Sequence, residues 1–102
     1  QGPPMTKDLL ISALQLRRVV TLTYQGYTRT VEPHCIGVDK HGVAKLRCFQ
    51  TSGGSNSGNP VDWKLFIVRE IHSASMSEAV FSSARPGYRR GDSAMRRIDA
   101  QL

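Results

Sequence analysis

Hydrophobic residues near the N-terminus recur at intervals of three and four positions, the spacing of a helix that buries one face. These residues are Leu9, Leu10, Ala13, Leu14 and Leu16. Thr6 precedes them as a suitable N-cap, and Asp8 lies in the first turn, where the helix dipole favours a negative charge. Arg17 and Arg18 follow at the far end, where the dipole favours positive charge. The pattern predicts a helix over residues 6–18.

From residue 19 the pattern changes to the two-residue alternation of β-strands. Val20, Leu22 and Tyr24 alternate with threonines, and Gly26 then provides a turn. Pro33 indicates an edge or a bulge in the strand that follows. Further strands are predicted at Thr28–Val38, Val43–Gln50 and Trp63–Ile71, with a break near Arg69-Glu70 that leaves a short fifth strand ending at Met76.

The remaining segments lack strand-like alternation. Residues Thr51–Pro60 are small and polar, so they bury little apolar area and are predicted to form a long flexible loop. Near the C-terminus, Asp92 or Ser93 can cap a short terminal helix. Three apolar residues would share one face of that helix: Met95, Ile98 and Leu102.

Together these elements predict an α+β fold, a small β-barrel of four to five antiparallel strands with an N-terminal helix and a short C-terminal helix. The chain has 102 residues, enough for one domain. We interpret residues 1–4 as an expression-tag remnant and residues 5–102 as that domain. Within it we expect the helix at 6–18, the barrel at 19–76 and a basic C-terminal extension at 77–102.

The net positive charge of the chain favours negatively charged binding partners. Fourteen lysines and arginines against eight acidic residues give a net charge of +6. The C-terminal extension holds a basic group of residues, Arg85, Arg89, Arg90, Arg96 and Arg97. A basic surface attracts phosphate backbones, although many small proteins are basic without binding nucleic acid. No apolar run reaches the ~18–20 residues of a membrane span, so we expect no membrane contact and a cytoplasmic protein.

The sequence offers little catalytic or metal-binding chemistry. Cys35 and Cys48 are predicted to be reduced, buried apolar groups that face the barrel core. Adjacent strand residues point to opposite faces, so His34 and Cys35 can hardly share a metal ion. Glu32 and His34 share a face, either as an acid–base pair or as a hydrogen-bonded histidine on a solvated face. Without a nucleophile or phosphate-loop motif, we predict no enzyme, no metal and no cofactor.

The predicted strands also carry side chains suited to an anionic ligand. They are Tyr24, Arg29, His34, Arg47 and Lys64. Guanidinium groups make paired hydrogen bonds to phosphate, and aromatic rings stack on bases. Each residue also has a structural interpretation: Tyr24 can belong to the core, Arg29 can pair with Glu32, and Lys64 can lie on a solvated face.

Four segments, in their order and spacing, resemble the WYL domain of bacterial transcription regulators and defence-system controllers. They are Val20–Tyr24, Arg29–His34, Leu46–Gln50 and Trp63–Ile71. The resemblance implies an Sm-like, SH3-like barrel that senses a ligand through a basic pocket, with nucleotides or nucleic-acid fragments as leading candidates. The positions that match that pocket are Tyr24, Arg29, His34, Arg47 and Lys64.

Two features depart from the family pattern. The Trp-Tyr-Leu tripeptide that names the family falls at Ala44–Leu46, where only the leucine is kept. WYL domains are usually attached to a DNA-binding domain, whereas one N-terminal helix is too little for a helix-turn-helix. We therefore expect a stand-alone WYL-like protein.

Two functions remain open. The first is a non-enzymatic module that binds single-stranded nucleic acid or a nucleotide-like anion at a basic barrel face, in bacterial regulation or defence, with Tyr24 or Phe49 stacking on bases. The second is an adaptor whose exposed strand edge pairs with a regulatory partner protein or a second copy, giving a homo-oligomer. Trp63 and Phe66 are assigned to the core rather than to a stacking platform.

Overall fold

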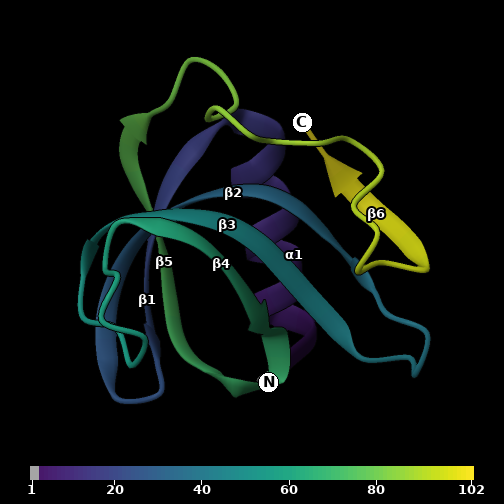
Figure 1. Ribbon diagram of the computed structural model, residues 1–102, viewed down its shortest axis with the longest axis horizontal. Coiled ribbons are helices and arrows are strands. Elements are labelled where there is room, and N and C mark those ends of the chain that lie inside the picture. Colours follow the sequence, from purple (N-terminus) through teal and green to yellow (C-terminus); the bar gives the residue numbers. More distant parts are fainter. Residues whose placement is uncertain (1–2) are drawn as a thin grey trace.

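One helix packs across a curved antiparallel sheet of six strands (Figure 1). This computed structural model describes residues 3–102, with side chains from Thr6 onward. Residues 1–2 of the interpreted tag lie outside the described part. The elements are α1 (Pro3–Leu16), β1 (Arg18–Tyr24), β2 (Tyr27–Val38), β3 (Ala44–Gly53), β4 (Asp62–Ile67), the 3-10 helix η1 (Val68–Glu70), β5 (Ile71–Val80) and β6 (Arg97–Gln101).

Strand β2 organises the sheet because it pairs with three other strands. The strand order is β4-β3-β2-β1-β5, with β6 also paired to β2. One edge of β2 pairs with β3, while the other edge pairs with β1 through residues 27–31 and with β6 through residues 35–38. Among the described residues, the end strands β4 and β5 do not pair with each other. The sheet is therefore not closed, and the predicted barrel is not confirmed.

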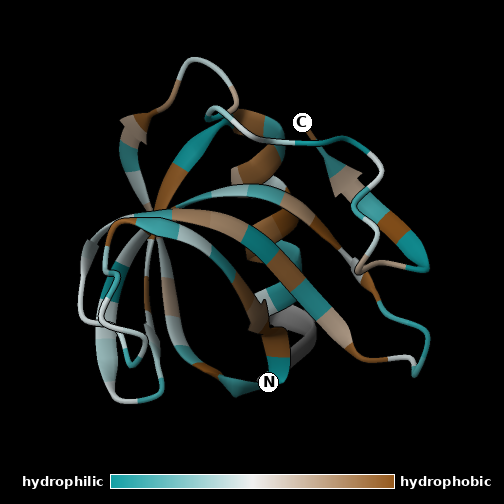
Figure 2. Cartoon of the chain, viewed as in Figure 1, coloured by the Kyte–Doolittle hydropathy of each residue, from teal (hydrophilic) through white to brown (hydrophobic). Residues whose placement is uncertain are grey.

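The hydrophobic core lies between α1 and the sheet. Leu10, Ala13 and Leu14 of α1 are buried and pack with strand residues in one cluster, as the helical spacing predicted. In Figure 2, α1 lies behind the sheet and carries several hydrophobic residues, drawn in brown. The helix begins at Pro3, so Thr6 lies inside it and is not the predicted N-cap. It ends at Leu16, before the predicted residue 18, because Arg17 adopts a left-handed φ of 55° and β1 then begins.

The four predicted strands after the helix are present, with shifted ends. Strand β3 continues to Gly53, so the connection to β4 is shorter than the predicted loop at residues 51–60. The predicted break near residues 69–70 is confirmed as the 3-10 helix η1. Strand β5 runs to Val80, beyond the predicted end at Met76.

The predicted C-terminal helix is wrong, because residues 97–101 form strand β6 instead. Gly37 of β2 permits this pairing: a Cβ atom at that position would lie 2.2 Å from the carbonyl oxygen of Arg97. Asp92 begins a turn rather than capping a helix, with its carbonyl oxygen accepting from the N–H of Met95. The ion pair of Lys7 with Asp99, at 2.7 Å, then ties α1 to β6. In the described part of the chain, no helix has the length and apolar character needed to cross a membrane.

Candidate functional site

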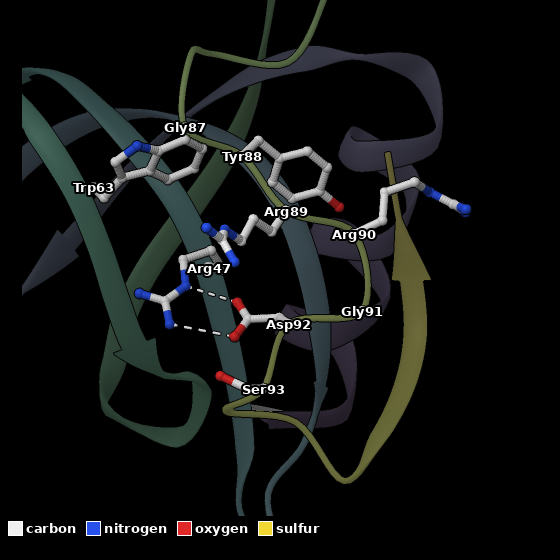
Figure 3. A pocket seen from close by; sticks show the side chains of 9 residues that line it. All are labelled: Arg47, Trp63, Gly87, Tyr88, Arg89, Arg90, Gly91, Asp92 and Ser93. Carbon is white, nitrogen blue, oxygen red and sulfur yellow. Dashed lines mark hydrogen bonds and ion pairs between the residues drawn. The ribbon is translucent and has the colours of Figure 1, made fainter.

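The best-formed cavity lies between the outer face of the sheet and the segment that leads to β6. Its volume is about 530 Å³. Figure 3 shows the residues that line it, which are Arg47, Trp63, Gly87, Tyr88, Arg89, Arg90, Gly91, Asp92 and Ser93. We call this cavity the arginine pocket. Strands β3 and β4 supply only Arg47 and Trp63, so residues 87–93 form most of its wall.

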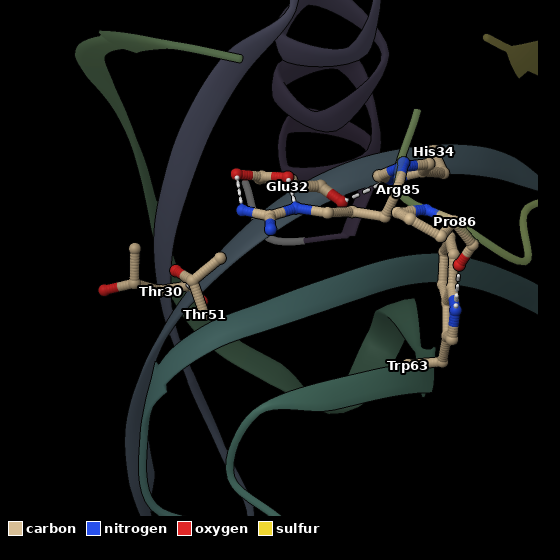
Figure 4. A network of polar contacts seen from close by, with 7 residues as sticks. All are labelled: Thr30, Glu32, His34, Thr51, Trp63, Arg85 and Pro86. Atoms are coloured by element: carbon tan, nitrogen blue, oxygen red, sulfur yellow. Dashed lines mark hydrogen bonds and ion pairs between the residues drawn. The ribbon is translucent and has the colours of Figure 1, made fainter. Parts of the chain in front are cut away.

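The wall is held in place by hydrogen bonds that Arg85 donates to the sheet and that Pro86 accepts from it (Figure 4). The guanidinium of Arg85 binds both carboxylate oxygens of Glu32, at 2.8 and 2.9 Å. Its backbone N–H donates to Nε2 of His34 at 3.0 Å. The indole N–H of Trp63 donates to the carbonyl oxygen of Pro86 at 3.4 Å. The C-terminal extension therefore packs on the sheet and completes the pocket.

His34 acts within this contact as a neutral ring. It is fully buried, and its Nδ1 lies 2.8 Å from the carbonyl oxygen of Glu32. Since that oxygen can only accept, Nδ1 carries the proton and Nε2 is left to accept from Arg85. Burial lowers the pKa of His34 below its usual value of 6.5, although the Glu32 carbonyl and carboxylate raise it in part. His34 thus positions the wall and does not face the cavity.

Aromatic rings form one side of the arginine pocket. The ring of Trp63 lies 6.2 Å from that of Tyr88, with an angle of 22° between their planes. Trp63 also meets Phe49 and His34 edge-on, at 5.4 and 4.8 Å. The hydroxyl of Tyr88 donates to the carbonyl oxygen of His34 at 3.2 Å, which fixes the ring. Trp63 is only partly buried, so its assignment to the core is incomplete: the indole packs on the sheet and also lines the pocket.

The cations of the pocket differ in how far they are neutralised. Arg47 is paired with Asp92, with Nε 2.7 Å and Nη2 3.4 Å from the two carboxylate oxygens. Burial tends to raise the pKa of Asp92, but hydrogen bonds from Arg47 and from the N–H of Ala94 lower it overall. Arg90 donates to the carbonyl oxygen of Leu102 at 2.8 Å. Arg89 is exposed and, among the described residues, pairs with no carboxylate. Its side chain points toward Arg47 and Trp63 in Figure 3.

Tyr24 and Arg29 meet each other away from the arginine pocket. Arg29 is only 2% exposed, and its guanidinium donates to the carbonyl oxygen of Tyr24 at 3.3 Å and to Oε1 of Gln50 at 3.2 Å. The guanidinium carbon lies 5.1 Å from the ring of Phe66 and 5.6 Å from that of Tyr24. Nη2 of Arg29 is buried with no hydrogen-bond partner among the described residues. The proposed pairing of Arg29 with Glu32 is wrong, since Glu32 pairs with Arg85.

Lys64 organises the loop between β3 and β4. Its ammonium donates to Oγ of Ser55 at 2.8 Å, to Oγ of Ser57 at 3.0 Å and to the carbonyl oxygen of Asn59 at 2.8 Å. All of these acceptors are neutral, so no carboxylate is among the partners of the ammonium. The loop is therefore tethered by a cation, rather than being free of contacts as its composition suggested.

The last two predicted basic residues lie elsewhere. Arg97 belongs to β6 and pairs with Asp99 at 3.0 Å. Arg96 is exposed and lies, with Lys40, beside a second and shallower hollow at the turn between β2 and β3. Of the predicted anion-binding residues only Arg47 lines the arginine pocket, whereas Tyr24, Arg29, His34 and Lys64 do not. Arg89 and Arg90 of the predicted basic C-terminal group join Arg47 there.

Within the described residues, no group of three or more His, Cys, Asp or Glu side chains is placed to hold a metal ion. Cys35 and Cys48 are free and buried, as predicted. Burial raises the pKa of both thiols, that of Cys35 to about 11, so neither is a thiolate near neutral pH.

Sequence reasoning missed Tyr88 and Asp92 as parts of the site. The Arg-Pro-Gly-Tyr run at residues 85–88 has neither helical nor strand periodicity, so it predicts no element. Binding residues often lie on loops that a rigid scaffold positions, so the aromatic Tyr88 between Arg85 and Arg89 was the available signal. Comparison with protein families, with curated proteins and with solved structures found no match for this chain.

Proposed function

We propose that this protein is a non-enzymatic binding module that takes single-stranded nucleic acid or a nucleotide-like anion in the arginine pocket. The observation that carries the proposal is the exposed, unpaired Arg89 beside the rings of Trp63 and Tyr88. A planar base and a phosphate need these two kinds of group side by side.

The chemistry of the pocket matches the two halves of a nucleotide. A base that stacks on Trp63 or Tyr88 would gain ~1–3 kcal/mol. Arg89 can meet a phosphate without first breaking an ion pair, and Arg90 gives up only one backbone contact. Asp92 offers acceptor oxygens near Arg47 that suit a sugar hydroxyl or an exocyclic amine.

The resemblance to WYL domains supports a regulatory role for such binding. In that family a basic pocket on a small barrel senses the ligand, and the curved sheet of this chain would serve as its scaffold. Here the C-terminal extension supplies most of the pocket wall. We infer a role in bacterial regulation or defence from the resemblance alone.

Fluorescence anisotropy with labelled single-stranded and double-stranded oligonucleotides, at about 50 and 200 mM salt, tests the proposal. Replacing Arg89 and Arg90 together by alanine should weaken binding about tenfold or more and flatten the salt dependence. The matched control replaces Lys40 and Arg69, two exposed cations outside the pocket, and should change affinity much less. Equal losses in the two double variants would indicate general charge attraction and would contradict the pocket.

A competition arm separates the two ligand classes. An unlabelled nucleoside monophosphate that displaces the oligonucleotide at micromolar concentration would indicate a nucleotide sensor. Displacement only by longer strands would indicate a nucleic-acid module. Absence of any binding at low salt, with quenching of the single Trp63 also absent, would remove the proposed function.

A further inference from the structure

Strand β4 ends the sheet and, in the part of the chain that the structure describes, pairs only with β3. The backbone N–H of Trp63 donates to Oδ1 of Asp62 at 2.8 Å, and that of Ile67 donates to the hydroxyl of Tyr24 at 3.1 Å. Both donors therefore point away from β3, and by the alternation of a strand so does that of Leu65 between them. The first part of β4 thus presents outward backbone groups that pair with no strand among the described residues, and the outward N–H of Trp63 bonds only to the side chain of its neighbour Asp62.

The charges on this edge lack opposite partners within the chain. Asp62 is exposed, and its carboxylate accepts from the N–H of Trp63. Lys64 bonds only to neutral oxygens, and neither residue has an ion-pair partner among the described residues. The two side chains lie two positions apart and so share one face of β4. Val61, just before the strand, is a large apolar residue that is 60% exposed.

We propose that two copies of this chain pair through their β4 edges, antiparallel, about a two-fold axis at Trp63. In this register Asp62 of each copy lies opposite Lys64 of the other. Val61 of each copy lies opposite Leu65 of the other, which covers the exposed side chain. Odd-numbered residues such as Trp63 would form the backbone hydrogen bonds between the two copies. Asp62 and Lys64 then face each other as a non-hydrogen-bonded pair, the kind of pair whose side chains lie closest together.

The charges also exclude the neighbouring registers. Only every second residue of β4 points its backbone groups outward, and these residues must lie opposite each other in the two copies. The nearest alternative registers therefore move the two-fold axis by one residue, from Trp63 onto Asp62 or onto Lys64. The first shift would place the two Asp62 side chains opposite each other, and the second would do the same for Lys64. Like charges directly opposite are unfavourable. Only the register centred on Trp63 is complementary to itself, as a two-fold interface requires.

This pairing has a consequence for the arginine pocket but does not depend on a ligand. Trp63 faces the pocket side of the sheet, opposite to Asp62 and Lys64. Two copies joined at Trp63 would therefore bring two pockets side by side and extend the basic surface across the axis. A dimer that binds no nucleotide would retain this inference and remove the proposed function, and a ligand-binding monomer would do the reverse.

Sedimentation over a range of concentrations, with charge-reversed variants, tests the interface. Asp62→Lys and Lys64→Asp should each raise the dimer dissociation constant about tenfold or more, because two attractive pairs become repulsive. The double variant Asp62→Lys/Lys64→Asp restores complementarity and should recover the dimer. Glu78→Lys on the exposed part of β5 is the control and should leave the equilibrium unchanged. A wild-type chain that stays monomeric, or a double variant no better than the singles, overturns the inference.

Cross-linking provides a second test that does not rely on the stability of the charge variants. An oxidised mixture of Asp62→Cys chains and Lys64→Cys chains should form a mixed disulfide dimer, since opposite residues lie within disulfide reach. Either variant alone should not, because its two cysteines would be offset by two residues along each strand. Cys35 and Cys48 are buried and stay outside the reaction. Equal cross-linking in the separate variants, or none in the mixture, contradicts the register.

Discussion

The backbone N–H of Arg85 donates a hydrogen bond of 3.0 Å to Nε2 of His34. The same ring donates from Nδ1 to the carbonyl oxygen of Glu32. Protonation would place a second N–H on the ring, directly facing the N–H of Arg85. The wall of the arginine pocket therefore depends on one protonation state of a buried side chain.

Acidification should weaken the fold through His34. Its folded pKa lies below 6.5, the value expected in the unfolded chain, so the unfolded state binds more protons between those two values. The stabilising effect is fully present above pH 6.5 and is lost as the pH falls toward the lowered pKa. The free energy of unfolding, measured with urea at intervals from pH 7.5 to 5, should fall by up to ~1.4 kcal/mol per pH unit in that window.

A glutamine at position 34 separates titration from packing. His34→Gln retains one amide donor and one acceptor, so it should flatten the pH dependence between 7.5 and 5 even if it lowers stability at every pH. His72→Gln, an exposed histidine on β5, should keep the wild-type profile. An unchanged slope in His34→Gln would show that another group is responsible.

The paired hydrogen bonds of Glu32 with Arg85 should measurably hold the C-terminal extension. Glu32→Gln removes the charge of a buried carboxylate whose partner is partly exposed, with 41% of the Arg85 side chain accessible. We expect a loss of about 1 kcal/mol in the free energy of unfolding, a modest value because of that exposure. Trypsin should also cut faster after Arg89 or Arg90. Glu78→Gln, which alters an exposed carboxylate, should change neither measurement.

Two arginines that look alike in the sequence should differ greatly in how much their loss destabilises the fold. Arg29→Ala removes a buried stem and leaves Oε1 of Gln50 without its donor, so it should lower the free energy of unfolding by about 3 kcal/mol. Arg89→Ala should change stability by no more than ~0.5 kcal/mol, because Arg89 is exposed. Urea denaturation of both variants checks this directly. Similar losses in the two would mean that Arg89 has a structural role.

The contrast between these arginines shows what local sequence patterns can predict. The N-terminal helix and the first four strands can be predicted because their apolar residues recur at the period of a helix or of a strand. This period can be recognised in the sequence without knowing any tertiary contact. A positive charge at Arg29 carries no comparable signal. Its burial depends on Phe66 and Gln50, which are distant in sequence and become neighbours only in the sheet.

The C-terminal segment was unpredictable for a similar reason. Met95, Ile98 and Leu102 fit a helical face, and nothing near them excludes one. The strand forms because Gly37 leaves room for β6, and because the chain returns to place Asp92 beside Arg47. The arginine pocket could be anticipated only in part, since Arg47 and the C-terminal arginines were recognisable as cations while their convergence was not.

Neutralising Asp92 should increase anion affinity at the arginine pocket, provided that the proposed function holds. Asp92→Asn keeps the acceptor for the N–H of Ala94 but releases Arg47 from its ion pair. We expect binding of a single-stranded oligonucleotide to tighten about three- to tenfold at 50 mM salt, with a steeper salt dependence from the added phosphate contact. Anisotropy titrations at two salt concentrations measure both. Asp99→Asn, which frees Lys7 and Arg97 outside the pocket, is the matched control. A larger effect from Asp99→Asn would contradict the role of the pocket.

Gly37 should be essential for the pairing of β2 with β6. A Cβ atom there would meet the carbonyl oxygen of Arg97 at 2.2 Å and the Cα of Ile98 at 3.1 Å, and both are backbone atoms that cannot rotate away. Gly37→Ala should therefore displace β6 and lower the free energy of unfolding by about 2 kcal/mol or more. Hydrogen exchange should speed up selectively at residues 97–101, while the paired amides of β1 and β3 stay protected.

The control for this substitution is Gly58→Ala, which introduces the same side chain at a loop position with a positive φ of 81° and no atom within 4 Å. Its strain is local, so exchange in β6 should not change. Because residues 87–93 lead directly into β6, Gly37→Ala should also loosen the wall of the arginine pocket. Unaltered protection of residues 97–101 in Gly37→Ala would show that β2 can shift to admit a side chain and that the close approach is not what selects a strand over a helix.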